Sequence, residues 1–487
     1  MTKAVGTSVP QLDAQREAFA EASRFRSDFY ACLTAHRDEL FELTDAMLCA
    51  DGPVRTPVDL TLLAEHRRGH GALYAALNHG RIDVARLRRT LAAVPQPKAA
   101  DDRLVLAVDV SNWLRPDAEC SADRLFCHTF GRGRDQHLMI PGWPYSFVAA
   151  LESGRTSWCQ LLDAVRLGSE DDVAEVTALQ VRRVVEDLIA GGRWCEGDSD
   201  ILVVFDAGYD VPRMAYLLEG LPVEVLGRMR SDRVMRRPTP TQLEYSQAYP
   251  RGGRYPKHGK EFRFAKPETW SEPDATTVQV TGRYGTAQAM AWDRLHPRLT
   301  TRSAWIDHDS ELPIIEGTLI RLEVDHLPGG GDPLPVWLWS SATAMTGTDV
   351  DLRWQAFLRR FDLEHTFRMI KQTLGWTRPK LRTPAADRWT WLIIVAHTQL
   401  WLARPLAEDA RRPWERPMEP NRLTPARVRR GFRNLRPALP CPARAPKPSR
   451  PGPGRPLGSK NQQPATRYDV GKTVRRPSII ERDQIRP

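Results

Sequence analysis

The sequence predicts an α/β fold in which a mixed β-sheet is flanked by helices. Two continuous apolar runs, RLVLAVDVS (103–111) and DILVVFDAG (200–208), are typical of strands buried in the middle of such a sheet. Between them, EDDVAEVTALQVRRVVEDLIAGG (170–192) is an amphipathic helix that begins with acids and ends in glycines, as helix termini favour. The chain has 487 residues, long enough for two or three domains.

Residues 1–98 are expected to form a helical N-terminal domain. Helical periodicity is clear in PQLDAQREAFAEASRFRSDFYACLTAHRDEL and in IDVARLRRTLAAV, where Asp83 is a plausible N-cap. The segment LLAEHRRGHGALYAALNHG could be a helix-turn-helix or a helical pair that packs without contacting DNA, and the sequence leaves both open. PQPKAADD (95–102) is typical of a linker.

Residues 103–230 are expected to form the first part of the sheet domain. Further strands are predicted within RLFCHTFGRG, SFVAALESG and SWCQLLDAVRLG, and the second aspartate-bearing strand is followed by a helix, DVPRMAYLLEG, and a strand, LPVEVLGRM. This order of strands and helices indicates a mixed sheet.

The composition and hydrophobic periodicity of the second half of the chain change twice. Residues 231–345 begin as a polar, Pro- and Gly-rich loop and continue as four strand-like runs, which predicts a β-rich insertion. Residues 346–410 return to helical periodicity and are expected to complete the sheet domain with a helix through DLRWQAFLRRFDLEHTFRMIKQTLGW and a second one after it.

Positive charge is concentrated in residues 411–487. They hold 20 Lys+Arg and 5 Asp+Glu, a net +15, whereas residues 1–410 hold 50 and 55, a net −5. They also hold 15 of the 39 prolines and little apolar periodicity, which predicts a basic, disordered tail. Such a tail favours a polyanionic partner, most often nucleic acid, although it could simply be solvated.

The composition also bears on location. No apolar stretch approaches about 18 residues, so no membrane span or membrane partner is expected. The N-terminus lacks the apolar core of a signal peptide. The seven cysteines are scattered and do not form a disulfide pattern. We therefore expect a cytoplasmic protein.

Both buried strands end in an aspartate, Asp109 and Asp206. An ionised carboxylate in a buried strand is costly unless it is paired, hydrogen-bonded or bound to a metal. One such residue could simply cap a turn. Two of them on strands that are expected to be neighbours favour a shared cation site.

The third candidate acid is Glu364, in FLRRFDLEHTFRMIK (357–371). On a uniform helix at about 100° per residue, Phe357, Arg360, Glu364 and Lys371 fall within an arc of roughly 60° beside the apolar face. An ordinary Arg–Glu pair at the edge of a core would explain this placement equally well. Three carboxylates could instead hold two divalent metals, and the basic residues could grip phosphates.

These residues resemble those of the bacterial insertion-sequence DDE transposases. This family belongs to the retroviral-integrase superfamily. The closest likeness is to the group with a β-rich insertion and a Tyr-x2-Arg-x3-Glu-x6-Lys signature, which reads here as Phe357, Arg360, Glu364 and Lys371. The likeness covers about 103–405. The one departure in the signature is Phe357 in place of tyrosine, which removes a hydroxyl.

The resemblance implies a ribonuclease-H-like catalytic core that cuts and joins double-stranded DNA. Asp109, Asp206 and Glu364 would be catalytic and would ligate two Mg²⁺ or Mn²⁺ ions. Arg360, Lys371 and Arg368 would bind DNA. The family also implies a homodimer acting on paired transposon ends.

Three further features leave alternatives. PGPGRPLGSKNQ resembles an AT-hook, in which Arg455 would enter the minor groove. Trp337 and Trp339 could stack on a flipped base, but packing is their ordinary role. The protein could also be a catalytically inactive DNA-binding regulator, or a two-metal nuclease without strand transfer.

Overall fold

The computed structural model describes residues 9–130, 137–154, 156–306, 308–419, 422–447, 458, 463–470 and 474–475. Arg455 lies outside the described residues, so the AT-hook prediction has no structural counterpart here.

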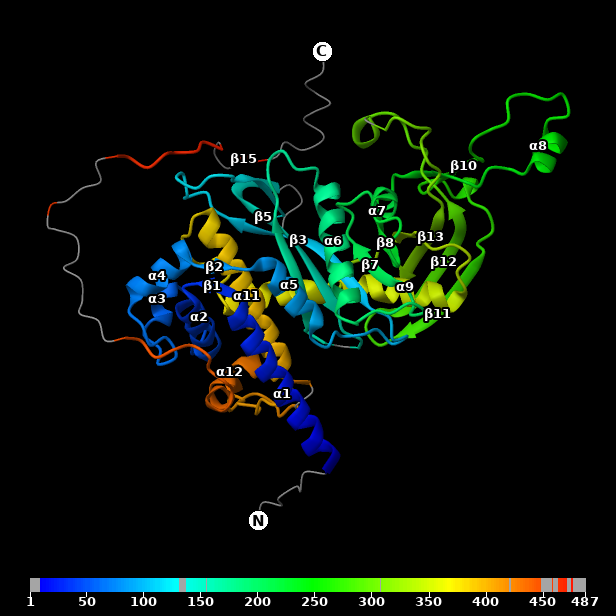
Figure 1. Ribbon diagram of the computed structural model, residues 1–487. Coiled ribbons are helices and arrows are strands. Elements are labelled where there is room, and N and C mark those ends of the chain that lie inside the picture. Colours follow the sequence, from blue (N-terminus) through cyan, green and yellow to red (C-terminus); the bar gives the residue numbers. More distant parts are fainter. Residues whose placement is uncertain are drawn as a thin grey trace.

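A large mixed sheet runs through the protein (Figure 1). Its middle consists, in spatial order, of β6 (Cys159–Arg166), β5 (His137–Leu151), β3 (Val105–Leu114), β7 (Ile201–Phe205) and β8 (Val223–Met229). β3, β7 and β8 are parallel, whereas β5 is antiparallel to both β3 and β6. β4 (Leu125–Phe130) and β15 (Val474–Arg475) also pair with β5. The mixed sheet predicted from the sequence is therefore present.

Helices cover both faces of this sheet, which explains why the central strands are apolar throughout. Leu106 and Val108 of β3 pack with residues of α6 (Val173–Ala190) and α7 (Val211–Leu217). Val105 and Ala107, which point to the opposite face, belong to the core that includes α9 (Gly347–Arg359) and α11 (Thr383–Ala403).

The predicted insertion is β-rich, and it continues the central sheet. It contributes β11 (Ala275–Thr281), β12 (Gly285–Leu295), β13 (Gly317–Val324) and β14 (Val336–Ser340), and β14 pairs antiparallel with β8. A small separate sheet pairs β9 (Val234–Arg236) with β10 (Glu261–Arg263), and α8 (Gln242–Ala248) stands out on the loop between them (Figure 1).

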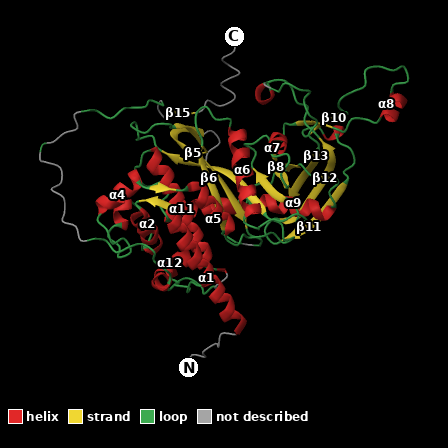
Figure 2. Cartoon of the chain, viewed as in Figure 1, coloured by secondary structure: helices red, strands yellow, loops and turns green. Residues whose placement is uncertain are grey.

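The N-terminal segment is mainly helical. It contains α1 (Val9–Cys32), α2 (Arg37–Cys49), α3 (Pro57–Leu60), α4 (His70–His79) and α5 (Val84–Ala93). Asp83 caps α5 by accepting a hydrogen bond from the Arg86 amide, as predicted. The short strands β1 (Leu33–Ala35) and β2 (Arg81–Ile82), which pair with each other, were not expected. Figure 2 shows these helices gathered with α11 at one end of the sheet.

The prediction of a disordered tail from residue 411 is wrong for part of that tail. Residues Pro425–Leu435 form α12, which packs on α2 and α11. Leu423, Val428 and Phe432 are fully buried in this contact. Apolar residues at 428 and 432 lie one helical turn apart, and Pro425 suits a first helical turn. The high proline content of the whole tail obscured this local signal.

Within the described part of the chain, no helix is both long enough and apolar enough to cross a membrane.

Candidate active site

Asp109 and Asp206 lie side by side, as the sequence predicted. β3 and β7 are parallel neighbours, and the last registered pair is Val108 opposite Phe205. The next residue of each strand is its aspartate. The Asp109 side chain is 22% exposed and that of Asp206 is 40% exposed. Both carboxylates therefore border the interior at the same edge of the sheet.

A buried guanidinium joins these two carboxylates. Arg360 Nη1 lies 2.9 Å from Asp109 Oδ2, and Arg360 Nη2 lies 3.4 Å from Asp206 Oδ2. The Arg360 side chain is only 4% exposed. The rings of Phe357 and Phe361 flank it, with centroids 5.9 and 5.0 Å from Cζ. Phe357, the departure from the family signature, thus packs against this guanidinium.

The helical segment that carries Arg360 is not uniform, contrary to the sequence-based assumption. α9 ends at Arg359 and α10 (Asp362–Arg368) begins after a tighter turn, in which the amides of residues 360, 361, 363 and 364 bond to carbonyls three residues earlier. A π-helical turn, Met369–Thr373, then follows. The tight turn overwinds the helix and the π turn underwinds it. The segment therefore departs from the uniform helix on which the arc of Phe357, Arg360, Glu364 and Lys371 was predicted.

Glu364 is exposed on α10, and its negative charge acts on the carboxyl group of Asp109. Burial, together with the smaller effects of the negative charges of Asp206 and Glu364, raises the pKa of Asp109 to about 6. Arg360 and the hydrogen bond from the Val110 amide act in the opposite direction. The three predicted acids thus share one electrostatic environment, in which Arg360 is the compensating cation.

Lys371 also belongs to this environment. Burial lowers the pKa of its ammonium group, and the negative charge of Asp109 opposes that shift. Its Nζ lies 6.0 Å from the ring centroid of Phe367 and 5.6 Å from that of Trp376. Arg368, in contrast, is exposed on α10.

The carboxylate oxygens of Asp109 and Asp206 are of the kind that binds a hard divalent cation, but in this structure they are ion-paired with Arg360. Among the described residues, no three His, Cys, Asp or Glu side chains are arranged to hold a metal ion. Carboxylate oxygens are the ligands that Mg²⁺ and Mn²⁺ prefer. The Arg360 guanidinium stands where positive charge is needed between the two aspartates.

A family model described as DDE superfamily endonuclease matches residues 28–298. The chain belongs to the DDE superfamily endonucleases. The matched part of this DDE endonuclease includes Asp109 and Asp206 and ends before Arg360, Glu364 and Lys371. No curated protein matches the chain.

Family membership gives the class of chemistry. A DDE endonuclease is a nuclease whose substrate is DNA, and enzymes of this family typically use divalent metal ions. Asp109 and Asp206 both lie within the matched residues, and their carboxylates share Arg360 as a cationic partner.

The two tryptophans of the insertion pack in the protein interior, in line with their ordinary role. Trp337 stacks on Phe264 with ring centroids 4.4 Å apart and is 4% exposed. Trp339 is fully buried and donates a hydrogen bond to the Leu295 carbonyl.

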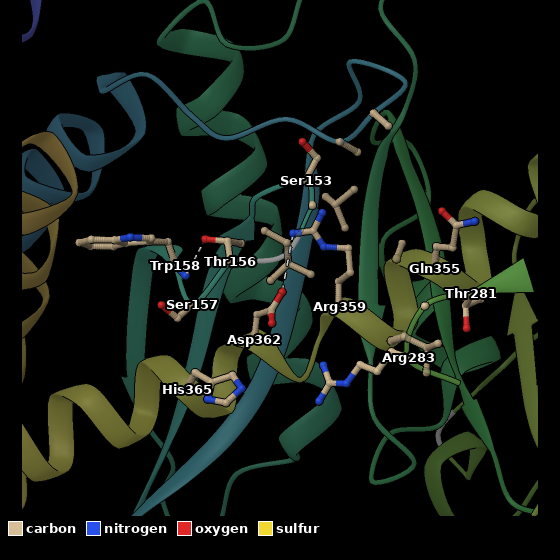
Figure 3. Close-up of a pocket in the computed structure, with 18 of the residues that line it drawn as sticks. Ser153, Thr156, Ser157, Trp158, Thr281, Arg283, Gln355, Arg359, Asp362 and His365 are labelled. Carbon is tan, nitrogen blue, oxygen red and sulfur yellow. Dashed lines mark hydrogen bonds and ion pairs between the residues drawn. The ribbon is translucent and has the colours of Figure 1, made fainter. Parts of the chain in front are cut away.

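Sequence reasoning missed a second charged pair on the same helical segment. Arg359 and Asp362 lie at the α9–α10 turn and line a large cavity (Figure 3). Their spacing of three residues could have signalled an ion pair. It could not have signalled the cavity, whose walls come from distant segments.

Proposed function

We propose that this DDE endonuclease is a transposase that cuts DNA at the ends of its element and joins them to target DNA. The pairing of Asp109 with Asp206 on adjacent parallel strands carries the proposal. The strand order β6–β5–β3–β7–β8 with β5 antiparallel supports the ribonuclease-H-like core that the sequence resemblance implies.

Asp109, Asp206 and Glu364 are the proposed metal ligands and catalytic residues. Two Mg²⁺ or Mn²⁺ ions, when bound, would supply stabilisation of the attacking and leaving oxygens of an in-line phosphoryl transfer. The two aspartates are held on rigid strands, whereas Glu364 comes from α10, which packs on β3, β5 and β6. This arrangement lets helix movement adjust the third ligand.

Arg360 and Lys371 are the proposed phosphate-binding residues of the site. Arg360 is held by the aspartates in the structure described above. Divalent ions would replace its charge there, and the released guanidinium could then bind a phosphate through two hydrogen bonds. Lys371 would act as a point charge beside Asp109. Arg368, exposed on α10, would contact DNA further out.

The remaining assignments extend this proposal. The helical N-terminal region would recognise transposon ends, and the protein would act as a homodimer on paired ends in the cytoplasm. The excess charge of residues 411–487 supports contact with DNA.

Cleavage of the element's own ends tests the proposal. With Mg²⁺ or Mn²⁺, the protein should nick the ends and yield joined products. Asp109→Asn, Asp206→Asn and Glu364→Gln should each abolish both reactions and leave DNA binding intact. Full activity in any of the three would remove that residue from the site. Nicking without joined products would indicate a nuclease alone.

One observation favours a second candidate, a DNA-binding regulator without nuclease activity. The buried Arg360 guanidinium contacts both aspartates at the place where the proposed metal ions would bind. If this ion pair is permanent, the protein would bind element ends equally well in EDTA and in Mn²⁺, and it would nick under neither condition.

A further inference from the structure

A sizeable cavity lies outside the proposed metal site. It has a volume of about 870 Å³ and is bounded by the α9–α10 turn, the β11–β12 hairpin, the loop between β5 and β6, and residues near 418–424. Figure 3 shows Arg359 and Asp362 facing each other across its floor and Arg283 reaching in from the hairpin.

The cavity carries an excess of positive charge. Arg283, Arg359, Arg404 and Arg422 line it, and Asp362 is the one acidic residue among the described lining residues. Arg404 is ion-paired at 2.8 Å with Glu152, outside the lining. Three arginines therefore face one carboxylate. Such a field favours an anionic ligand.

Arg359 lines this space and has unused hydrogen-bonding capacity. Its side chain is 20% exposed, and its Nη2 is 3.7 Å from the Asp362 carboxylate, too long for a hydrogen bond. Within the described residues, neither its Nε nor its Nη2 has a hydrogen-bond partner. Buried donors are usually satisfied, so the Arg359 guanidinium would gain hydrogen bonds by turning outward to a ligand oxygen in the cavity.

The lining also contains groups suited to the rest of a nucleotide. Arg283 lies over the ring of Tyr284, with Cζ 5.6 Å from its centroid, and this pair offers a surface on which a base can stack. The Thr156 hydroxyl accepts a hydrogen bond from the Trp158 amide, which leaves its own proton available to a ligand (Figure 3).

The position of the cavity relative to the acids indicates that its anionic ligand would be part of a DNA strand. Val105 lines the cavity, and Asp109 lies four residues later on the same face of β3, about 13 Å away along the strand. The adjacent residues Arg359 and Arg360 point to the cavity and to the acids respectively. A strand leaving the acids can reach the cavity within a few nucleotides.

We propose that this cavity binds an unpaired nucleotide through its phosphate and base. The inference rests on the proposed function only in taking that nucleotide from a DNA strand at the active site. A duplex is too wide for the cavity, so the nucleotide must be single-stranded or frayed. A free nucleotide offers the same phosphate and base, and the experiment separates the two sources.

The test measures binding in EDTA, so that no cleavage is needed. Fluorescence anisotropy would compare a duplex that carries a short single-stranded extension with the same duplex made blunt. The variant combines Arg283→Ala with Arg422→Ala. Both arginines are exposed, so their removal should leave the hydrophobic core intact. Arg16→Ala, an exposed residue of α1 outside the cavity, is the control for loss of charge.

We expect the double variant to bind the extended duplex about tenfold more weakly. The slope of the logarithm of its binding constant against the logarithm of salt concentration should become shallower by about 0.7 for each lost phosphate contact. The blunt duplex and the Arg16→Ala protein should change less than about twofold. Equal losses for both duplexes, or no loss for the extended one, would overturn the proposal.

Two further arms complete the experiment. If the bound nucleotide belongs to a DNA strand, deoxyadenosine monophosphate should displace the extended duplex no better than sodium sulfate of equal ionic strength. If the cavity binds free nucleotides, the monophosphate should displace the duplex better than sulfate does. Asp206→Asn protein should keep its preference for the extended duplex. If wild-type protein shows that preference but never cleaves, the proposed function fails while this inference stands.

Discussion

Arg360 and Asp109 form an ion pair of 2.9 Å although 251 residues separate them in the chain. The pair places a helical guanidinium against the carboxylate of a central strand, in the position where the proposed function requires divalent cations. Arg360 and the metal ions therefore compete for the same negative charge, and this competition can be measured.

Replacing Arg360 should separate metal binding from stability. In Arg360→Ala protein, the aspartates lose their internal cation, so the melting temperature without metal should fall and Mn²⁺ should bind more tightly. Saturating Mn²⁺ at about 100 times its Kd should restore about 2.7 kcal/mol. Calorimetric titration and thermal unfolding check both effects. Arg368→Ala, on the exposed side of α10, is the matched control, and identical Mn²⁺ affinities in the two variants would contradict the competition.

Metal affinity should depend on pH through Asp109. Its pKa of about 6 lies above that of an aspartate in an unfolded chain, because burial disfavours the charge. The folded protein therefore holds this proton more tightly, and ionisation of Asp109 lowers stability as pH rises from about 4 to about 6. Metal binding needs the ionised form, so Mn²⁺ affinity should fall by up to about tenfold between pH 6 and pH 5. Asp109→Asn should flatten the profile over this interval.

The junction between α9 and the sheet should depend on Arg353. Its guanidinium donates to both oxygens of the buried Glu224, at 2.9 and 2.7 Å. Arg353→Ala leaves that carboxylate less compensated and should lower the free energy of unfolding by about 3–5 kcal/mol. Denaturant titration would measure the change, with Arg368→Ala as the control expected to stay within about 0.5 kcal/mol.

The same pair predicts a loss of stability in acid. Burial opposes the charge of Glu224, but the hydrogen bonds from Arg353 prevail and hold the pKa of this carboxyl below its usual range. Its stabilising contribution is therefore present above the pKa of an unfolded glutamate, and it is lost as pH falls through the lowered value. Wild-type and Arg353→Ala proteins should converge in stability at low pH, and a constant difference down to acid pH would contradict this.

The docking of α12 should contribute measurably to stability. Arg429 is 5% exposed and donates hydrogen bonds to the carbonyls of Met47 and Gly52. Arg429→Ala leaves buried carbonyls without donors and should cost about 2–4 kcal/mol. Arg467→Ala removes the same side chain from an exposed part of the tail, where it is 78% exposed, and should cost less than about 0.5 kcal/mol. Equal unfolding free energies would show that the contact is incidental.

Local patterns in the sequence were sufficient for most secondary structure. The continuous apolar runs before Asp109 and Asp206 identified two adjacent strands, because only a strand with both faces covered is apolar throughout. Asp83 marked the start of α5 through its capping side chain. Helix α12 was missed because composition averaged over the whole tail outweighed one short amphipathic segment.

The sequence by itself determined the two apolar strand segments that run up to Asp109 and Asp206 and the helical character of the segment that carries Glu364, because each depends on residues close together in the chain. Only the tertiary structure decided that the insertion extends the same sheet, that Arg360 bridges the aspartates, and that Arg359 opens onto a cavity. These relationships depend on the local winding of the α9–α10 segment and on contacts between residues hundreds of positions apart. Neither quantity is encoded in hydrophobic periodicity.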